Sequence, residues 1–456
     1  MTFRPWLLPG AAALVFAAPF AAPFAAADYR DAASRLIGAA MTDNEGLARL
    51  EYLCDRIGNR LSGSPALEKA VAWAEQEMKN AGLENVHSIP VMVPHWVRGR
   101  ESLELIEPLA RPIAMLGLGG SVGTPGQGIE ADVVVVETFN ELQKLGKANV
   151  TGKIVLFNAP FVSYDKTVPF RRDGPMRAAR LGAVAALVRS ITPFSMRTPH
   201  TGGTTYMDGV PQIPGAAVSV EDAMSLARLA KSGAKVRVKL IMDAHMEPDA
   251  MSADVMGEIK GREKPDEVVV LGGHIDSWDV GQGAHDDGGG VMAALEAVAL
   301  IKKLGLTPRR TIRVVFWTNE ENGGRGARAY RDWIGKAITK HVAAIEMDGG
   351  AEQPVGFDIA ASEQAARSSP LFARSAAIAQ LLKRVGATRV MKGSSEADVT
   401  PLFAEGVPAL ALRTVMTHYF DYHHSQADTF DKIVPDEFRR CAAAFAVMSY
   451  VLADWP

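Results

Sequence analysis

The second half of the chain alternates short apolar runs with amphipathic segments, and this rhythm limits the fold more than any other feature. Continuous apolar runs such as EVVVLGG (267–273) and RVVFW (313–317) are typical of strands buried on both faces. The segments between the runs, such as residues 288–305 and 435–452, have helical periodicity. Strands that alternate with helices predict an α/β fold: a mixed, mostly parallel sheet flanked by helices.

The first 27 residues have the layout of a secretory signal peptide. Arg4 precedes an apolar stretch, and the small residues Ala25, Ala26 and Ala27 precede Asp28. A short basic region, an apolar core and a small-residue cleavage site are the three parts of such a signal. Pro9, Pro19 and Pro23 interrupt the stretch and disfavour a membrane anchor. We therefore expect export to the periplasm or the extracellular space, with no stable membrane anchor after cleavage.

A turn-rich stretch, SVGTPGQG, introduces a second region at residues 121–245. Strand-like and helix-like segments alternate there, and we interpret AARLGAVAALVRS (178–190) as a helix. None of these segments carries a cluster suited to acid–base or metal chemistry. We expect an inserted α/β domain at 121–245, with residues 28–120 and 246–456 forming one discontinuous catalytic domain.

The net charge and the two cysteines indicate which partners and which cross-links to expect. The chain of 456 residues has a formal net charge of −3, and no cluster of basic residues indicates nucleic-acid binding. An exported protein could pair its two cysteines, Cys54 and Cys441. However, Cys54 lies on the apolar side of a helical pattern with Leu47, Leu50 and Ile57, which favours a buried free thiol.

Polar residues follow the apolar strands of the second half. In an open α/β sheet, ligands bind outside the carboxyl ends of the strands, so residues distant in sequence can meet there. Asp286 stands at the glycine-rich entry to the next helix, and His424 follows the last strand. The other candidates come directly after strands: His274, Asp276, Glu320, Glu321 and Asp348.

The charges in this set indicate a metal site. Asp286, Glu321 and Asp348 would bring three negative charges into one cleft, which is costly without a counter-charge. The motifs themselves contain no lysine or arginine that could neutralise them. Mixed histidine and carboxylate ligands suit zinc, and two metals about 3.5–4 Å apart are an arrangement of hydrolytic aminopeptidases. The sequence therefore predicts two Zn²⁺ ions and hydrolysis.

Each candidate also has an ordinary explanation when it is taken alone. An acidic, glycine-rich stretch is often a surface loop, a Glu-Glu pair is often a solvated helix end, and a single histidine is often structural. The common position of the candidates at strand ends of one α/β unit favours a functional site.

The motif order H-x-D, D-D-G, E-E, D-G and H-x-x-x-D-T resembles that of the M28 co-catalytic zinc peptidases. The stretch GGHIDSWDVGQGAHDDGGG (272–290) is similar to the carboxypeptidase Q-like branch, whose members are exported and act on dipeptides and short peptides with free N-termini. Residues 121–245 resemble, more weakly, a protease-associated domain. The resemblance implies a peptide substrate and a homodimer.

The resemblance also implies a role for each motif residue. His274 and Asp348 would bind one zinc ion, Glu321 and His424 the other, and Asp286 would bridge them. Glu320 would be the general base, and Asp276 would hydrogen-bond the His274 imidazole. The peptide after the bridging aspartate, Asp286–Asp287, would be cis.

Some assignments stay open at this stage. The H-x-x-x-D-T spacing favours His424 over His423, no role follows for His285, and Asp398 and Tyr422 are candidates to shape the substrate site. Three other functions compete with peptide hydrolysis. They are a single-zinc acyltransferase like the glutaminyl cyclases, a receptor-like relative without activity, and a binding protein in which the insert is the working part.

Overall fold

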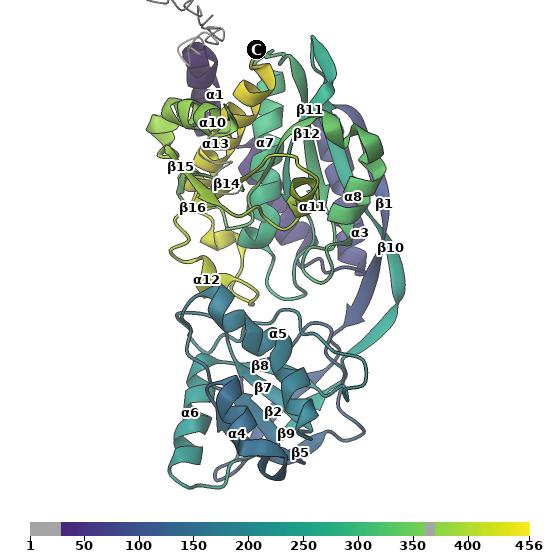
Figure 1. The fold of residues 1–456 in the computed structure, drawn as a ribbon, viewed down its shortest axis with the longest axis vertical. Coiled ribbons are helices and arrows are strands. Elements are labelled where there is room, and N and C mark those ends of the chain that lie inside the picture. The colour runs from purple at the N-terminus through teal and green to yellow at the C-terminus, as the bar shows by residue number, and fades with distance from the viewer. Residues whose placement is uncertain (1–28, 361–369) are drawn as a thin grey trace, which may run out of the picture.

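The computed structural model describes residues 29–360 and 370–456, and the expected signal peptide lies outside these ranges. The described chain forms two bodies, one above the other in Figure 1, and each is built on an eight-stranded sheet. None of the helices in the described part combines the length and the apolar composition needed to cross a membrane.

The sheet of the first body is mixed and parallel at its centre, as predicted. Its strands lie in the order β1 (Glu84–Val97), β10 (His245–Ile259), β12 (Arg310–Trp317), β11 (Lys264–His274), β13 (His341–Glu346), β16 (Ala409–Thr414), β14 (Pro354–Ala360) and β15 (Arg389–Gly393). The four consecutive strands β12, β11, β13 and β16 are parallel. The pairs β1–β10, β10–β12 and β14–β16 are antiparallel, and the sequence patterns did not reveal β14.

Helices cover both faces of this sheet because successive strand residues point to opposite sides. Val269 and Leu271 pack with one group of helices: α1 (Arg30–Thr42), α2 (Glu45–Tyr52), α3 (Pro65–Asn80), α7 (Gly289–Lys303), α10 (Pro370–Ala379) and α13 (Pro435–Asp454). Val268 and Val270 pack with α8 (Arg325–Ile334) and α11 (Thr400–Ala404). Cys54 and Cys441 are buried free thiols, which confirms the favoured interpretation.

The second body contains more of the chain than residues 121–245. Its strands lie in the order β3 (Arg111–Ile113), β2 (Glu101–Glu107), β9 (Arg237–Met242), β5 (Ile129–Val136), β6 (Ile154–Phe157), β7 (Ala185–Arg189), β8 (Gly215–Val218) and β4 (Met115–Gly117). Helices α4 (Phe139–Val150) and α5 (Tyr164–Arg180) pack on one face and α6 (Val220–Lys231) on the other. Strands β2, β3 and β4, which precede residue 121, therefore belong to the second sheet. The sequence did not predict this, because the pattern of a strand does not reveal which sheet the strand enters.

The predicted helix at 178–190 was wrong. Helix α5 ends at Arg180, Gly182 has a positive φ of 84°, and Ala185–Arg189 forms the buried strand β7. A short apolar run fits a buried strand and a buried helix equally well, so periodicity alone did not separate the two.

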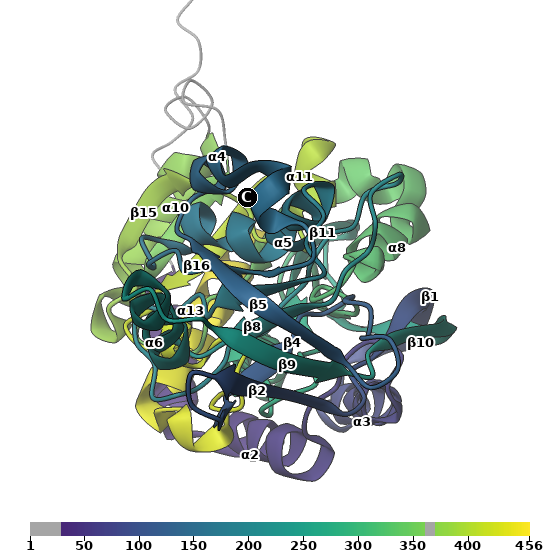
Figure 2. The same cartoon turned by 90° about the horizontal axis from the view of Figure 1, so that it is seen from below.

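The two bodies are joined by the long antiparallel pair β1–β10, which runs from the first body into the second (Figure 1). Seen from below, β5, β9 and β2 of the second sheet cross in front of the first body (Figure 2). Two residues of the 272–290 motif lie in this junction. Trp278 packs into the core of the second body, and both carboxylate oxygens of Asp279 accept hydrogen bonds from Arg98, at 2.7 and 2.6 Å.

Candidate metal centre

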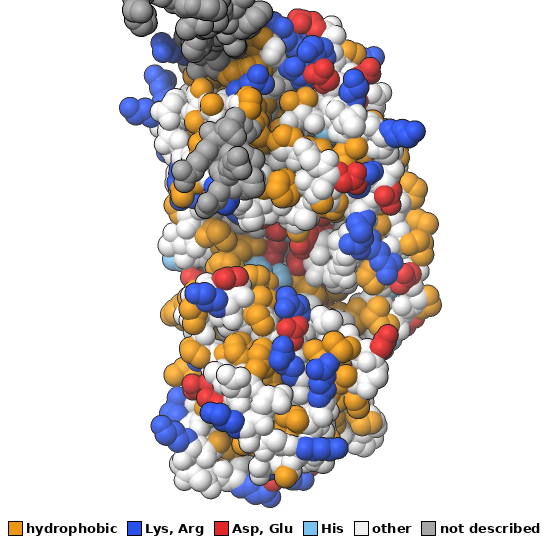
Figure 3. Space-filling view, in the orientation of Figure 1, with side chains coloured by type: hydrophobic (Ala, Val, Ile, Leu, Met, Phe, Trp, Pro, Cys, Tyr) orange, Lys and Arg blue, Asp and Glu red, His pale blue; other side chains and the backbone are white. Residues whose placement is uncertain are grey.

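The parallel strands deliver the predicted site residues to one place. His274 is the last residue of β11, Glu320 and Glu321 follow β12, and Asp348 follows β13. Asp286 lies in the turn before α7, and His424 lies just after the short helix α12 (Tyr419–Tyr422). In Figure 3, acidic and histidine side chains gather in a hollow between the two bodies.

Asp286 stands at the centre of this group. Its Oδ1 lies 3.3 Å from Nε2 of His274, which also lies 3.3 Å from Oδ1 of Asp348. Its Oδ2 lies 3.2 Å from Nε2 of His424, which lies 3.1 Å from Oε2 of Glu321. The two oxygens of one carboxylate therefore face two separate histidine–carboxylate pairs. This is the arrangement expected of a carboxylate that bridges two metal ions.

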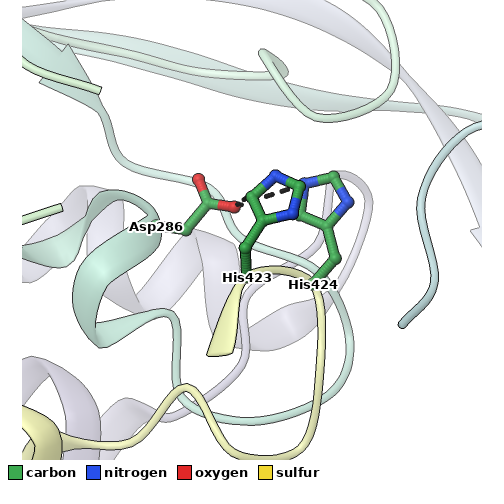
Figure 4. A group of neighbouring side chains, drawn as sticks. All are labelled: Asp286, His423 and His424. Carbon is green, nitrogen blue, oxygen red and sulfur yellow. Dashed lines mark ion pairs between the residues drawn. The ribbon is translucent and has the colours of Figure 1, made fainter. Parts of the chain in front are cut away.

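Both neighbouring histidines turn toward Asp286, as Figure 4 shows. Nε2 of His423 lies 3.7 Å from Oδ2 of Asp286, which is 0.5 Å farther than Nε2 of His424. The two imidazoles stack with ring centroids 3.5 Å apart. Of the two, His424 is the one paired with Glu321, in agreement with the H-x-x-x-D-T spacing.

The donor set fits a divalent cation. Ligand atoms of His274, Asp286 and Glu321 all lie within 4.8 Å of one another, and so do those of Asp286, His423 and His424. Oδ2 of Asp286 and Oε1 of Glu321 are buried and receive no hydrogen bond. A buried carboxylate oxygen without a donor is costly, and a metal ion removes that cost.

The carboxyl groups of the site lack sufficient counter-charge from the protein itself. Burial, together with the negative charge of Asp286, raises the pKa of Glu321 to about 7. Burial and the surrounding carboxylates also raise the pKa of Glu320 and Asp348. Divalent ions would supply the missing positive charge, and histidine with carboxylate ligands is a set that suits zinc.

Asp276 contacts the site differently from the expectation. Nδ1 of His274 donates to the main-chain carbonyl of Asp276 at 3.0 Å, whereas the nearest carboxylate contact measures 3.9 Å. The Asp276 carboxylate instead accepts the main-chain N–H groups of Glu320 and Glu321, at 3.1 and 3.4 Å. Strand β11 places this carboxylate beside the end of its neighbour β12, so it holds the segment that carries both glutamates.

Other aspartates fix the main chain around Asp286. Asp428, the acidic residue of H-x-x-x-D-T, accepts the N–H groups of His285 and Asp286 at 2.7 and 3.2 Å. Asp287 accepts the N–H groups of His274 and Gly290 at 3.2 and 3.0 Å. The Asp286–Asp287 peptide is cis, as the resemblance implied.

The sequence did not indicate that Arg60 belongs to the site. Arg60 is fully buried, and its guanidinium donates to the carbonyls of Ile275, Gln282 and Gly283. It therefore ties both ends of the loop between His274 and Asp286 to one point. No local motif surrounds Arg60, so only the folded chain reveals this contact.

The residues left open are now placed. His285 is buried, and its Nδ1 accepts the N–H of Ala351 at 3.2 Å, which is a structural role. Tyr422 stacks on His285, with ring centroids 5.8 Å apart. Within the described chain, neither Tyr422 nor Asp398 lines the cavity beside the site, whereas Tyr419 and Glu396 do.

This cavity has a volume of about 620 Å³ and is bounded by both bodies. The first body contributes Glu320, Glu321 and Asp348, and the second contributes Tyr164 and Arg171, among others. The volume lies within the range of ligand sites, about 300–1,000 Å³. A small ligand in this cavity would therefore lie beside Asp286, Glu321, Asp348, His424 and Glu320 together.

Comparison with known proteins agrees with this geometry. Residues 254–449 match the description "Peptidase family M28". Carboxypeptidase Q of Mus musculus is 43% identical over 431 residues, which cover 94% of this chain and 90% of the relative. The crystal structure of a Peptidase M28 precursor from Shewanella amazonensis SB2B has a TM-score of 0.90 and 34% identity, covering 94% of this chain and 98% of that one.

A more distant structure shares the fold alone. BSAP, a zinc aminopeptidase from Bacillus subtilis, has a TM-score of 0.67 at 18% identity, and covers 90% of this chain and 97% of that one. The high identity to carboxypeptidase Q over nearly the whole length identifies the family. The chain therefore belongs to peptidase family M28 and is a metallopeptidase.

Proposed function

We propose that this protein is an exported di-zinc exopeptidase that removes the N-terminal residue from dipeptides or short peptides. The observation that carries the proposal is the position of Asp286, whose two oxygens face two separate histidine–carboxylate pairs. His274 and Asp348 would hold one zinc ion, and Glu321 and His424 would hold the other. This donor set favours two ions over the single zinc of a cyclase-like acyltransferase.

The residues of the chain divide the chemistry. When bound, the metal ions supply Lewis acidity to a water molecule and to the scissile carbonyl. Glu320 lines the cavity beside the metal ligands, and it would take a proton from the attacking water and deliver it to the leaving amine. Asp276 would hold Glu320 in place through the main-chain N–H that it accepts.

The second body supports selectivity for short substrates. It closes one side of the cavity, with Tyr164 and Arg171 among the lining residues, so a long peptide has less room to pass. Three further points are part of the proposal and rest on the sequence. They are the protease-associated character of residues 121–245, export after cleavage before Asp28, and a homodimeric state.

The end of the peptide that is cleaved needs a direct test. The relative that is 43% identical is named a carboxypeptidase, whereas a relative of Aspergillus oryzae named "probable leucine aminopeptidase 2" is 29% identical over 272 residues. A dipeptide has both termini at the same bond, so its hydrolysis does not distinguish the two activities. Longer peptides blocked at one end do.

The first experiment combines metal analysis with peptide hydrolysis. We expect about two zinc ions per chain in the protein without residues 1–27, and the same content in Glu320→Gln. We expect Glu320→Gln to lose a factor of about 10²–10⁴ in kcat, because the variant keeps the ligands but lacks the general base. Zinc content by elemental analysis and release of amino acids by chromatography check both.

A matched set of peptides identifies the bond that is cleaved. We expect hydrolysis of a free dipeptide and of a C-terminally amidated tripeptide, and slower hydrolysis of longer peptides. N-acetylated peptides should resist. Cleavage of the acetylated peptide would show that the enzyme acts from the C-terminus. One zinc ion per chain with cyclisation of N-terminal glutamine would support the acyltransferase. Zinc binding without any turnover would support a receptor-like protein.

A further inference from the structure

The second body contacts residues 423–425, the segment that carries the proposed metal ligand His424. The N–H of Thr201 donates to the carbonyl of His424 at 2.8 Å. Nδ1 of His200 lies 2.6 Å from the carbonyl of His423, and a carbonyl can only accept, so this nitrogen carries the proton. His200 and Ser425 form an isolated antiparallel bridge. A loop more than 200 positions away in sequence thus pairs with the segment that carries a metal ligand.

Close packing fixes the two bodies relative to each other at this point. A Cβ atom added to Gly119 of the second body would lie 2.0 Å from the ring of Trp278 in the first body. The bidentate pair of Arg98 with Asp279 crosses the same junction. The contacts of Thr201 are therefore held in a defined position and are not those of a freely moving cover.

Two groups of the second body contact Nδ1 of His424. The Thr201 carbonyl oxygen lies 3.3 Å from this nitrogen and can only accept, and Nη1 of Arg171 lies 3.2 Å from it and can only donate. A metal ion bound at Nε2, which faces Asp286 and Glu321, requires the tautomer with Nδ1 protonated, and the Thr201 oxygen is then the acceptor of that proton. A histidine that binds a metal through one nitrogen is oriented in this way by the hydrogen bond of the other.

Arg171 supports the same carbonyl. Its Nη1 donates to the Thr201 oxygen at 3.0 Å, and its Nη2 donates to the hydroxyl of Tyr164 at 3.0 Å. The side chain is buried against Gly202, where an added Cβ would lie 2.2 Å from the guanidinium carbon. Among the described residues, the polar partners of the Arg171 guanidinium are the Thr201 carbonyl, the His424 imidazole and the Tyr164 hydroxyl, and none of them is acidic. A buried guanidinium without an ion pair is costly, so its place beside a metal ligand calls for an explanation.

We propose that Arg171 and the Thr201 carbonyl are positioning groups for His424, so that the second body completes the metal centre. Arg171 holds the carbonyl, the carbonyl accepts the Nδ1 proton of the metal-bound His424, and both groups contact the imidazole and fix its position. The inference rests on the proposed metal binding by Glu321 and His424. It assigns to the second body a task beyond limiting the length of the substrate.

Zinc affinity, measured by competition with a chelator, tests this role without any substrate. We expect Arg171→Met to weaken the binding of one zinc ion by about 10–100-fold and to leave the other ion unchanged. Arg171→Lys keeps a donor and the charge, and we expect it to restore part of the affinity. Arg180→Met, an exposed position at the end of the same helix, should bind both ions as the wild type does.

The outcomes separate this inference from the proposed function. Binding of both ions by Arg171→Met with wild-type affinity would overturn the inference and leave the di-zinc proposal standing. A wild-type protein that binds no zinc would remove both. Circular dichroism of the metal-free variants checks folding. If Arg171→Met does not fold, Arg171→Lys is the deciding variant. Wild-type affinity for both zinc ions, together with wild-type nitrogen NMR signals of His424 in the zinc-loaded protein, would then contradict a role of the Arg171 guanidinium.

Discussion

At the scale of single residues, the four aspartates of the 272–290 motif have four different tasks. Asp286 faces both histidine–carboxylate pairs, and Asp287 accepts the N–H groups at the end of β11 and the start of α7. Asp276 holds the main chain of the two glutamates, and Asp279 pairs with Arg98 across the junction of the bodies. The dense negative charge of the motif thus reflects one proposed metal ligand and three structural contacts.

The main-chain contact of Asp428 leads to a prediction. An amide at this position presents one acceptor and one donor to the two N–H groups that the carboxylate accepts. We expect Asp428→Asn to loosen the turn that carries Asp286 and to lower kcat/KM and zinc affinity by about 10–100-fold. Asp431→Asn, an exposed neighbour with the same chemical change, is the control. Wild-type kinetics and zinc affinity in Asp428→Asn would contradict this account.

At the scale of elements, α7 is buried along most of its length, and Glu296 is a buried charged residue at its contact with α2. A Cβ at Gly46 of α2 would lie 2.9 Å from the Glu296 side chain, so the two helices approach closely there. Arg49 pairs with Glu296 at 2.9 Å. Burial, with the nearby charge of Asp43, still raises the pKa of Glu296 to about 7, because Arg49 only partly offsets it.

The raised pKa of Glu296 predicts a pH dependence of stability. The folded protein holds this proton up to about pH 7, whereas the unfolded chain releases it near the ordinary value of 4.5. The resulting loss of stability is absent below pH 4.5, grows as the pH rises and is complete above pH 7. Glu296→Gln removes it, so we expect the variant to gain on the order of 2 kcal/mol relative to the wild type between pH 4.5 and 7.5.

Urea unfolding of metal-free wild type and Glu296→Gln at several pH values measures this difference. Other titrating groups are common to both proteins and cancel in the comparison. Glu51→Gln, an exposed position on α2, is the control and should follow the wild type. A constant difference between Glu296→Gln and the wild type over the whole pH range would contradict the assignment.

At the scale of the whole molecule, the acidic site lies where the two bodies meet, beneath the hollow in Figure 3. The site gathers carboxyl groups whose pKa values are raised by burial and by one another, as for Glu320 and Glu321. Bound cations would relieve this repulsion and also couple the two bodies through His424 and its partner Thr201.

Removal of metal should therefore destabilise the molecule. Ligand binding to the folded state alone stabilises it by about 4 kcal/mol when the free ligand is about 1,000 times Kd. We expect a chelator to lower Tm, and added zinc to restore it, in the wild type and equally in Glu320→Gln. Thermal unfolding of both proteins measures the effect. Equal Tm values for zinc-loaded and metal-free protein would show that the site does not hold the fold together.

The α/β class, the mostly parallel sheet and the strand-end position of the site residues were predictable from the sequence. Buried strands and amphipathic helices leave local periodic patterns, and parallel strands bring their carboxyl ends to one edge. The motif order also brought the proposed ligands, from His274 to His424, together without knowledge of any contact.

The tertiary structure decided the contacts between residues that are distant in sequence. It placed β2 to β4 in the second sheet, gave the His274 imidazole a main-chain partner in place of the Asp276 carboxylate, and set Arg171 and Thr201 behind His424. Such contacts depend on how the two bodies pack against each other, and the helix and strand propensities of a segment do not predict that packing. The sequence thus determined the fold class and the chemical groups of the site, and the packing of the two bodies determined what orients them.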